Sequence, residues 1–181
     1  SGATARDQKF LAVTGASHQA YADHFGLEYL ALKSGGLLDC WAALLTSYDQ
    51  VLYINSSCLI RPDTPSLFKR VPKEKIGWVK GRNDVVVFSR AQSNLKEWPD
   101  ENADLFYPLP YIFNRTFEDE VTLNGESRLE SYIVNYRHLE EPQIELVQKD
   151  IEEWSRMAPS FHKPTQIKVA LNGGLGDQID A

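Results

Sequence analysis

The sequence predicts an α/β fold, a single domain in which helices flank a mainly parallel central sheet. Short apolar runs bounded by turn residues alternate with stretches whose apolar side chains recur at helical spacing. The length of 181 residues suits one domain. The content of 43% hydrophobic and 24% charged residues is close to that of ordinary globular proteins. Together these observations exclude wholesale disorder.

The N-terminal part predicts a strand, a helix and a second strand, after an irregular lead-in over residues 1–8. The apolar run 10–13 is typical of a short strand and is followed by a Thr-Gly-Ala-Ser turn. Ser17 suits the N-cap of a short helix, and Gly26 lies where that helix would end. Residues 28–32 then predict a strand. This succession is the signature of a right-handed βαβ crossover and favours a parallel sheet.

A helix and a buried strand follow. Between residues 37 and 48 the apolar side chains fall on one helical stripe. Residues 50–54 form a near-continuous apolar run, which is typical of a strand buried on both faces of a sheet. The polar triplet 55–57 interrupts this run, and residues 58–60 are apolar again.

The centre of the chain predicts two more strands, at residues 76–79 and 85–88, and a helix over residues 89–98. From residue 98 to residue 117 the sequence loses any period but holds three prolines beside the aromatic side chains of Trp98, Phe106, Tyr107, Tyr111 and Phe113. We interpret that stretch as a long ordered loop.

The C-terminal part predicts a helix near residues 118–124, a strand over 132–136 and an amphipathic helix that begins at Ile144. Residues 166–171 are a further strand candidate. The glycine-rich stretch 172–177 follows them, in the pattern of a phosphate-binding turn.

Charge and cysteine content restrict the partners. The 19 basic and 25 acidic side chains give a net charge of −6, and the basic ones form no block. This argues against a nucleic-acid or anionic-membrane partner, because phosphate-rich surfaces need clustered positive charge. Cys40 and Cys58 lie in apolar surroundings and predict buried thiols in a reducing compartment. No apolar run approaches the length of a membrane span, so a cytoplasmic protein is expected.

The most specific pattern lies in residues 48–68. It consists of an apolar strand, a polar triplet, an apolar pair, and a turn that contains Pro-Asp and Pro-Ser-Leu-Phe. Residues 13–17, 119–124 and 162–164 carry shorter motifs in a matching order. Over about residues 9 to 165 the chain resembles the retaining, nucleotide-sugar-dependent glycosyltransferases of the GT-A fold, especially glycosyltransferase family 8. The resemblance implies a GT-A-like, Rossmann-like domain.

The chain departs from that family at its metal motif. Where the family has Asp-x-Asp, this chain has Asn55, Ser56 and Ser57, and the Asn-x-Gly of the family is altered to Asn83, Asp84 and Val85. By resemblance, Asn55, Ser57 and His162 would hold a divalent cation, usually Mn²⁺. Hard cations prefer charged oxygen ligands, and the first two of these side chains are neutral. Tight Mn²⁺ binding is therefore not expected.

The resemblance also implies roles for single residues. The donor-binding set is Thr14, Gly15, Ala16, Asn55, Ser57, Asn83 and Asp84, and Asp119 would be catalytic, beside the donor sugar. Arg61, Arg82, Lys163 or backbone amides would meet the charge of the leaving diphosphate. A plainer interpretation stays open for each: Thr14 caps a helix, Asn55 and Ser57 form a turn, Asp119 lies in a first helical turn, and His162 is an ordinary surface or core histidine.

Three functions are compatible with the sequence. The first is a glycosyltransferase that moves a sugar from a nucleotide-diphosphate donor, a UDP-sugar by resemblance, to a glycan or lipid-linked acceptor. The alternative is a catalytically degenerate domain of that fold, which acts as a binding or scaffolding module. In the third, residues 166–181 begin a second, GT-B-like domain that continues beyond Ala181, and the domain over residues 9–165 supports it.

Overall fold

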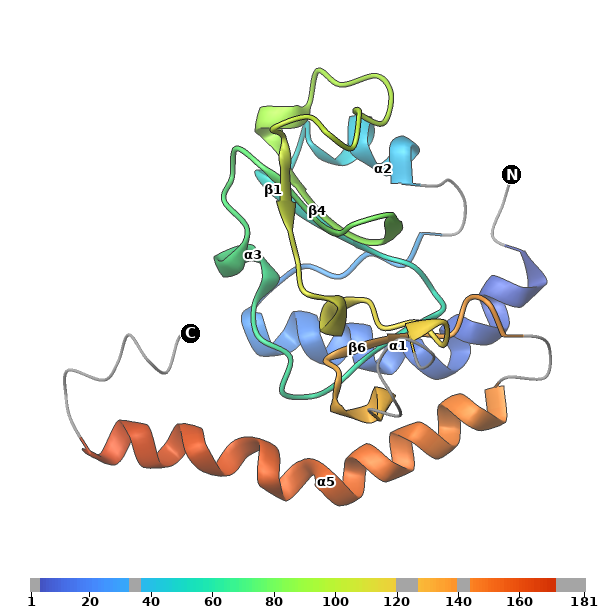
Figure 1. Cartoon of the computed structure of the whole chain (residues 1–181), viewed down its shortest axis with the longest axis vertical. Coiled ribbons are helices and arrows are strands. Elements are labelled where there is room, and N and C mark those ends of the chain that lie inside the picture. The colour runs from blue at the N-terminus through green and yellow to red at the C-terminus, as the bar shows by residue number, and fades with distance from the viewer. Residues whose placement is uncertain (1–3, 33–36, 120–126, 140–143, 172–181) are drawn as a thin grey trace.

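The structure is a computed structural model, and it describes residues 4–32, 37–119, 127–139 and 144–171; for Cys40, Ala42 and 158–171 it describes the backbone alone. The predicted burial of the Cys40 thiol therefore lies outside the described side chains. The described chain forms a small mixed α/β domain (Figure 1). A four-stranded sheet lies in its centre, with the short helix α2 (Leu37–Leu44) on one side and the long helices α1 (Ala5–Phe25) and α5 (Ile144–Leu171) on the other.

The central sheet is mostly antiparallel, and the expectation of a mainly parallel sheet is wrong. Its strands are β1 (Gln50–Ile54), β3 (Ile76–Val79), β4 (Arg82–Ser89) and β5 (Phe106–Pro108), in the order β1-β4-β3-β5. Only the pair β3–β5 is parallel. The physical reason is the connection between β3 and β4, which is two residues long and includes Gly81 at φ 78°. A connection this short allows only a hairpin.

A second, two-stranded sheet pairs β2 (Cys58–Ile60) with β6 (Ile133–Asn135) in antiparallel register. The strand predicted over residues 132–136 is confirmed at 133–135, as is the strand predicted at 50–54 in the central sheet, and β2 coincides with the apolar run 58–60. In this register Cys58 lies opposite Asn135. The residues on either side of β2 and β6 are therefore brought close together.

Helix α1 replaces the predicted strand at residues 10–13 and the turn after it. Thr4 caps the helix: its side chain accepts a hydrogen bond from the Asp7 N–H, and the Asp7 side chain accepts one from the Thr4 N–H. Phe10 and Thr14 lie one helical turn apart on the buried face of the helix. The apolar run therefore follows the helical period rather than that of a strand. The predicted end is correct, because Gly26 closes α1 with φ 66°.

Residues 28–32 belong to no helix or strand of the structure, so the predicted βαβ unit is not formed within the described chain. The segment leads from the end of α1 across to α2 (Figure 1). Leu30 and Leu32 are 44% and 43% exposed, which is unusual for a segment composed largely of apolar residues.

Further differences concern the helices and loops. The helix expected over residues 89–98 shortens to the 3-10 turn Arg90–Gln92. The predicted loop 98–117 contains β5 and a second 3-10 turn, Tyr111–Phe113. Helix α3 (Leu67–Arg70) and the 3-10 turn Arg128–Glu130 complete the secondary structure.

Helix α5 starts at Ile144, as expected, but continues to Leu171. Residues 166–171 are therefore helical, and the strand predicted there is wrong. Most of the helix predicted near 118–124 and the glycine-rich stretch 172–177 lie outside the described residues.

The core is divided by the central sheet. Along β4, Val85 and Val87 pack toward Tyr21 of α1, whereas Val86 and Phe88 pack toward Trp41 of α2. This alternation is the two-residue period of a strand that is covered on both faces. A third cluster lies between α1, the β2–β6 sheet and α5. The two layers of helices thus fix the position of β1 and of the turn that follows it.

Candidate functional site

The polar triplet after β1 forms a tight turn. The Asn55 carbonyl accepts a hydrogen bond from the Cys58 N–H at 3.0 Å. The Asn55 side-chain oxygen accepts two more, from the Ser57 N–H at 3.0 Å and the Ser57 hydroxyl at 2.9 Å. This is an Asx turn, in which the amide side chain takes the place of a backbone carbonyl. The turn interpretation of Asn55 therefore has a direct structural basis.

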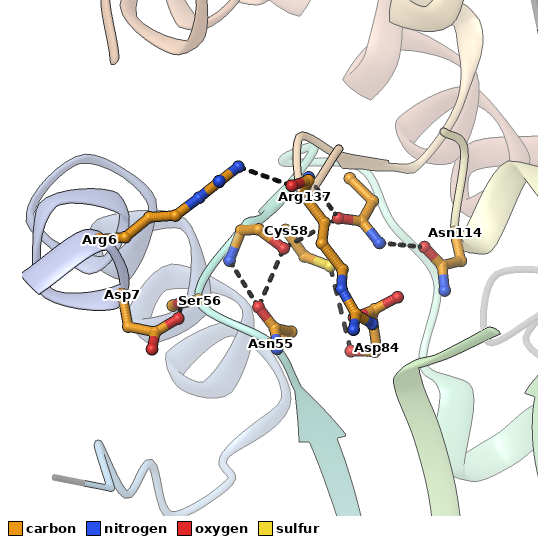
Figure 2. A network of polar contacts seen from close by, with 10 residues as sticks. Arg6, Asp7, Asn55, Ser56, Cys58, Asp84, Asn114 and Arg137 are labelled. Carbon is orange, nitrogen blue, oxygen red and sulfur yellow. Dashed lines mark hydrogen bonds and ion pairs between the residues drawn. The ribbon is translucent and has the colours of Figure 1, made fainter. Parts of the chain in front are cut away.

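A network of amide side chains connects this turn with β6 (Figure 2). The Ser57 hydroxyl lies 2.8 Å from Oδ1 of Asn135, which also accepts the Arg137 N–H at 3.0 Å. The Asn135 Nδ2 donates to Oδ1 of Asn114 at 3.0 Å. Asn114 and Asn135 are almost completely buried. The network therefore fixes the three segments relative to one another, because buried polar groups are costly to leave without partners.

Two arginines lie beside the turn. Arg137 makes an ion pair with Asp84 at 2.9 Å; the Asp84 side chain is 6% exposed and the Arg137 side chain 56%. Arg6, in the first turn of α1, donates to the backbone carbonyls of Arg137 and Leu139 at 2.6 and 2.7 Å. These acceptors are neutral, so they hold the Arg6 guanidinium without cancelling its charge.

These groups surround a cavity of about 500 Å³ beyond the end of β1. Its lining includes Asn55, Ser57, Asn83, Asp84, Arg6 and Arg137. The structure thus brings together the four predicted donor-binding residues that lie outside α1. We call this cavity the polar pocket.

Thr14, Gly15 and Ala16 lie in α1 and do not line the polar pocket. Thr14 is fully buried, and its hydroxyl donates at 2.7 Å to the carbonyl of Ser56. Gly15 faces Leu11 and the hydroxyl of Tyr29. In this arrangement the Thr14 hydroxyl holds the backbone of the 55–57 turn against α1 and does not face the pocket.

Asp119 lies outside the lining of the polar pocket and is connected to it through Arg82. Arg82 Nη1 donates to the Asp119 carboxylate at 2.8 Å, and the Thr116 N–H donates to the same carboxylate at 2.9 Å. Burial alone would raise the pKa of Asp119, but these hydrogen bonds and the Arg82 charge outweigh it and lower the pKa below 3.8. Asp119 is therefore a carboxylate at neutral pH.

The other predicted cations are differently placed. Arg61 makes a close ion pair with Asp63, at 2.6 Å. His162 and Lys163 lie in the part of α5 whose side chains are outside the described residues.

The donor set at the turn does not fit a hard divalent cation. Asn55 and Ser57 offer neutral oxygens that are already bonded to each other. The nearby carboxylates are also engaged: Asp84 pairs with Arg137, and Asp7 accepts from Thr4 and Ser56. Within the described ranges, no cluster of three His, Cys, Asp or Glu side chains is arranged to hold a metal ion.

Sequence reasoning missed Arg6, Arg137 and Asn135. Ser57 and Asn135 are 78 residues apart, and only the β2–β6 pairing joins them. For Asn135 the available signal was its place near the end of a predicted strand, similar to that of Asn55 directly after residues 50–54. Arg6 fell in the predicted lead-in, and the Thr4–Asp7 capping pattern was the sign that it belongs to a helix.

Beneath the pocket, Cys58 is a free, fully buried thiol. Burial raises the pKa of this thiol well above 9, and the nearby charge of Asp84 adds to the effect. A thiol in this environment is protonated and unreactive at neutral pH.

Comparison of the chain with models of protein families gives no match. A search of curated proteins gives no match either. In the part of the chain that the structure describes, no helix combines the length and the apolar character that crossing a bilayer requires.

Proposed function

We propose that the chain is a glycosyltransferase-like domain that binds a nucleotide-diphosphate sugar, a UDP-sugar, in the polar pocket and transfers the sugar to a glycan or lipid-linked acceptor. The observation that carries the proposal is the convergence of two guanidinium groups, Arg6 and Arg137, with the Asn55–Ser57 turn at the carboxyl end of β1. Two guanidinium groups beside one cavity favour a ligand that carries phosphate oxygens. The resemblance to GT-A glycosyltransferases supplies the substrate class.

The proposed site binds the diphosphate without a metal. Arginine forms paired hydrogen bonds to phosphate oxygens and stays charged at all physiological pH values. One guanidinium nitrogen of Arg137 is held by Asp84, and the side chain remains 56% exposed toward the pocket and solvent. Arg6 is held in place by two carbonyls. Both would stabilise the charge that develops on the leaving diphosphate.

Asp119 acts as a positioning residue in this proposal. It holds Arg82 in place, and Arg82 directly precedes the pocket residues Asn83 and Asp84. Its carboxylate is engaged by Arg82 and Thr116 rather than directed at the pocket. We expect Asp119→Asn to weaken donor binding less than substitution of Arg137.

A second candidate is a catalytically degenerate domain of the same ancestry that acts as a binding or scaffolding module. One observation favours it: the oxygens of Asn55 and Ser57 that would face a metal or a diphosphate are used within the turn and by Asn135. Such a closed arrangement holds the loops together without any ligand.

Calorimetric titration with UDP and UDP-glucose, in EDTA and then in Mn²⁺, tests the proposal. We expect binding in EDTA and little change with Mn²⁺. Arg137→Met should weaken binding by about tenfold or more, because a hydrogen bond to a charged group contributes about 1.5–3 kcal/mol. The matched control is Arg156→Met, an exposed arginine of α5, which should bind as the native chain does.

Three outcomes would change the proposal. Binding that requires Mn²⁺ would contradict the metal-free site. Binding that appears only in the double variant Asn55→Asp, Ser57→Asp would mean that the cleft persists while the native site has lost its ligand. If neither the native chain nor the double variant bound UDP or UDP-glucose, the proposed donor site would be contradicted and the scaffolding function would remain. Release of UDP from UDP-glucose then distinguishes an enzyme from a binding module.

A further inference from the structure

Beside β1 lies a second cavity, of about 570 Å³, which is independent of the proposed function. We call it the groove. One wall is β1, the opposite wall is the segment 27–32, and α1 forms the floor through Leu11, His18 and Ala22. The side chain of Tyr29 lies against α1, with its ring 6.2 Å from that of His18. The groove is therefore a channel between two extended segments, laid on one helix.

The wall formed by β1 is a sheet edge. β1 is the last strand of the order β1-β4-β3-β5. The bonds from the Asn55 N–H to the Asp84 carbonyl and from the Arg90 N–H to the Asp49 carbonyl show that odd-numbered residues bond to β4. In an antiparallel pair the alternate residues point their N–H and C=O groups away from the partner. The backbone groups of Gln50, Leu52 and Ile54 therefore point toward the groove.

Those edge groups have no backbone partner among the described residues. The segment 28–32 on the other side of the groove makes no backbone hydrogen bond to β1 there either. The Gln50 Nε2, at the start of the strand, is buried and has no hydrogen-bond partner. Unpaired edge groups beside an apolar channel are the usual template for an added strand.

The position of α1 gives the direction of the added strand. Thr4 and Asp7 line the groove at its Asn55–Ser56 end, where the Ser56 hydroxyl donates to Asp7. A strand that ran parallel to β1 would thus finish next to the first residue of α1. With α1 and the segment 28–32 after it, this strand would complete a βαβ crossover.

We propose that the groove is the seat of one further β-strand, an apolar segment of about five residues that runs parallel to β1 and is supplied by the polypeptide leading into Thr4. The strand would pair with Gln50, Leu52 and Ile54 on one side and with residues 28–32 on the other. It would also cover the exposed Leu30 and Leu32. Because both of its faces would be buried, its side chains should be apolar throughout.

The test attaches a five-residue extension of Val, Ile and Thr ahead of Ser1, so that residues 1–3 join it to Thr4. The control extension has the same length and consists of Gly, Ser and Asn. We expect the apolar extension to raise the melting temperature by about 5 °C or more. It should slow amide exchange at Leu52 and Ile54 on the order of tenfold, and the polar extension should do neither.

A blocking variant tests whether the extension occupies the groove. Leu52→Pro removes an N–H that points into the groove and takes no part in the pairing with β4. In the extended chain it should cancel most of the gain, relative to Leu52→Pro without the extension. Near-ultraviolet circular dichroism establishes that both variants are folded, and the gain from the extension is compared only between folded proteins.

Several results would overturn the proposal. One is equal melting temperatures with the apolar and polar extensions. Another is slow exchange at Leu52 and Ile54 in the chain without any extension, since the edge would then be already paired. Dimers formed by the extended chain, seen by light scattering, would mean that β1 edges pair between molecules. Protection by the free five-residue peptide, but not by the attached one, would exclude supply from the polypeptide that leads into Thr4.

Discussion

The polar pocket lies beyond the end of β1 and the groove lies along the outer edge of the same strand, and the two differ in how their polar groups are satisfied. At the end of β1, the side chains of Asn55, Ser57 and Asn135 bond to one another. Along the outer edge of β1, the backbone groups of Leu52 and Ile54 point into an apolar channel. The pocket is therefore held in shape by the described chain itself, whereas the backbone groups along the groove have no backbone partner among the described residues.

This difference predicts where the domain tolerates change. Substitutions in the network beside the pocket leave buried polar groups without partners and should be severe. Substitutions along the groove remove contacts that the described chain scarcely makes and should be mild until the groove is filled. The four predictions below test this contrast, from the largest expected effect to the smallest.

Asn135→Leu should lower the free energy of unfolding by about 3 kcal/mol, since it deprives Ser57, Arg137 and Asn114 of a partner inside the protein. Urea denaturation followed by circular dichroism measures the effect. Asn102→Leu, at an exposed site, is the matched control and should change stability by no more than about 0.5 kcal/mol. Equal effects of the two variants would mean that the network contributes little.

Asp119→Asn should cost about 1.5–3 kcal/mol at pH 7, because the charged hydrogen bonds with Arg82 and Thr116 are weakened. The pKa of Asp119 is lowered in the folded state. Its contribution is therefore complete above the unfolded value of about 4 and is lost as the pH falls through the lower folded value. The native chain and the variant should converge in acid. A difference that persists unchanged at pH 2.5 would contradict the charge-based explanation.

His18→Gln should alter the pH dependence of stability. His18 lies on the floor of the groove, and its Nε2 donates to the Cys58 carbonyl at 2.7 Å. Burial lowers the pKa of this histidine below 6.5. The unfolded chain thus takes up a proton first, and stability should decrease as the pH falls from 6.5 toward the lower folded value. Gln keeps an N–H donor but does not titrate. The free energy of unfolding, measured by urea denaturation at several pH values, should therefore change less with pH for the variant than for the native chain. If the free energy of unfolding changed equally with pH in the native chain and the variant, His18 would not be the group that causes the pH dependence.

Leu30→Ser should change the stability of the chain by about 0.5 kcal/mol or less, because the side chain is 44% exposed. In the chain with the apolar extension the same substitution should cost distinctly more, since Leu30 would then be covered. Leu59→Ala, at a site 1% exposed, is the comparison and should cost about 2–5 kcal/mol in both backgrounds. A large loss from Leu30→Ser without the extension would mean that the groove is already closed.

The strands β1 and β6 were predictable because each is an apolar run that ends at polar or turn-forming residues, whereas the three residues of β2 showed only as an apolar run. Helix α1 was not, because a four-residue apolar run fits a strand and a helix equally well. The decisive information was the Thr4–Asp7 capping pair, six to three residues before that run. The antiparallel pairing of β3 with β4 was not predicted, because β4 begins with three polar residues, Arg82 to Asp84, which are typical of a loop.

The candidate site was partly predictable for the same reason. Asn55 and Ser57 are close in sequence, as are Asn83 and Asp84, and the β1–β4 pairing brings the two pairs together. Asn135 is the last residue of β6 and Arg137 follows it, far along the chain, so their presence at the site depends on the register of β2 with β6. A resemblance confined to short local motifs gives no information on which strands pair or in which register, so it could not predict these two residues.

The four tryptophans are unequally distributed between the two sides of the central sheet. Of the four in the chain, Trp41, Trp78 and Trp98 lie together on the α2 side of the sheet, with ring centres 5.4 Å apart for Trp78 and Trp98 and 6.1 Å for Trp41 and Trp98. The fourth, Trp154, is buried on the α5 side. Intrinsic fluorescence therefore reports chiefly on one layer of the domain. Replacing Trp154 by Phe would leave a spectrum that reports on the α2 side alone, and the difference between the native and variant spectra would report on the α5 side.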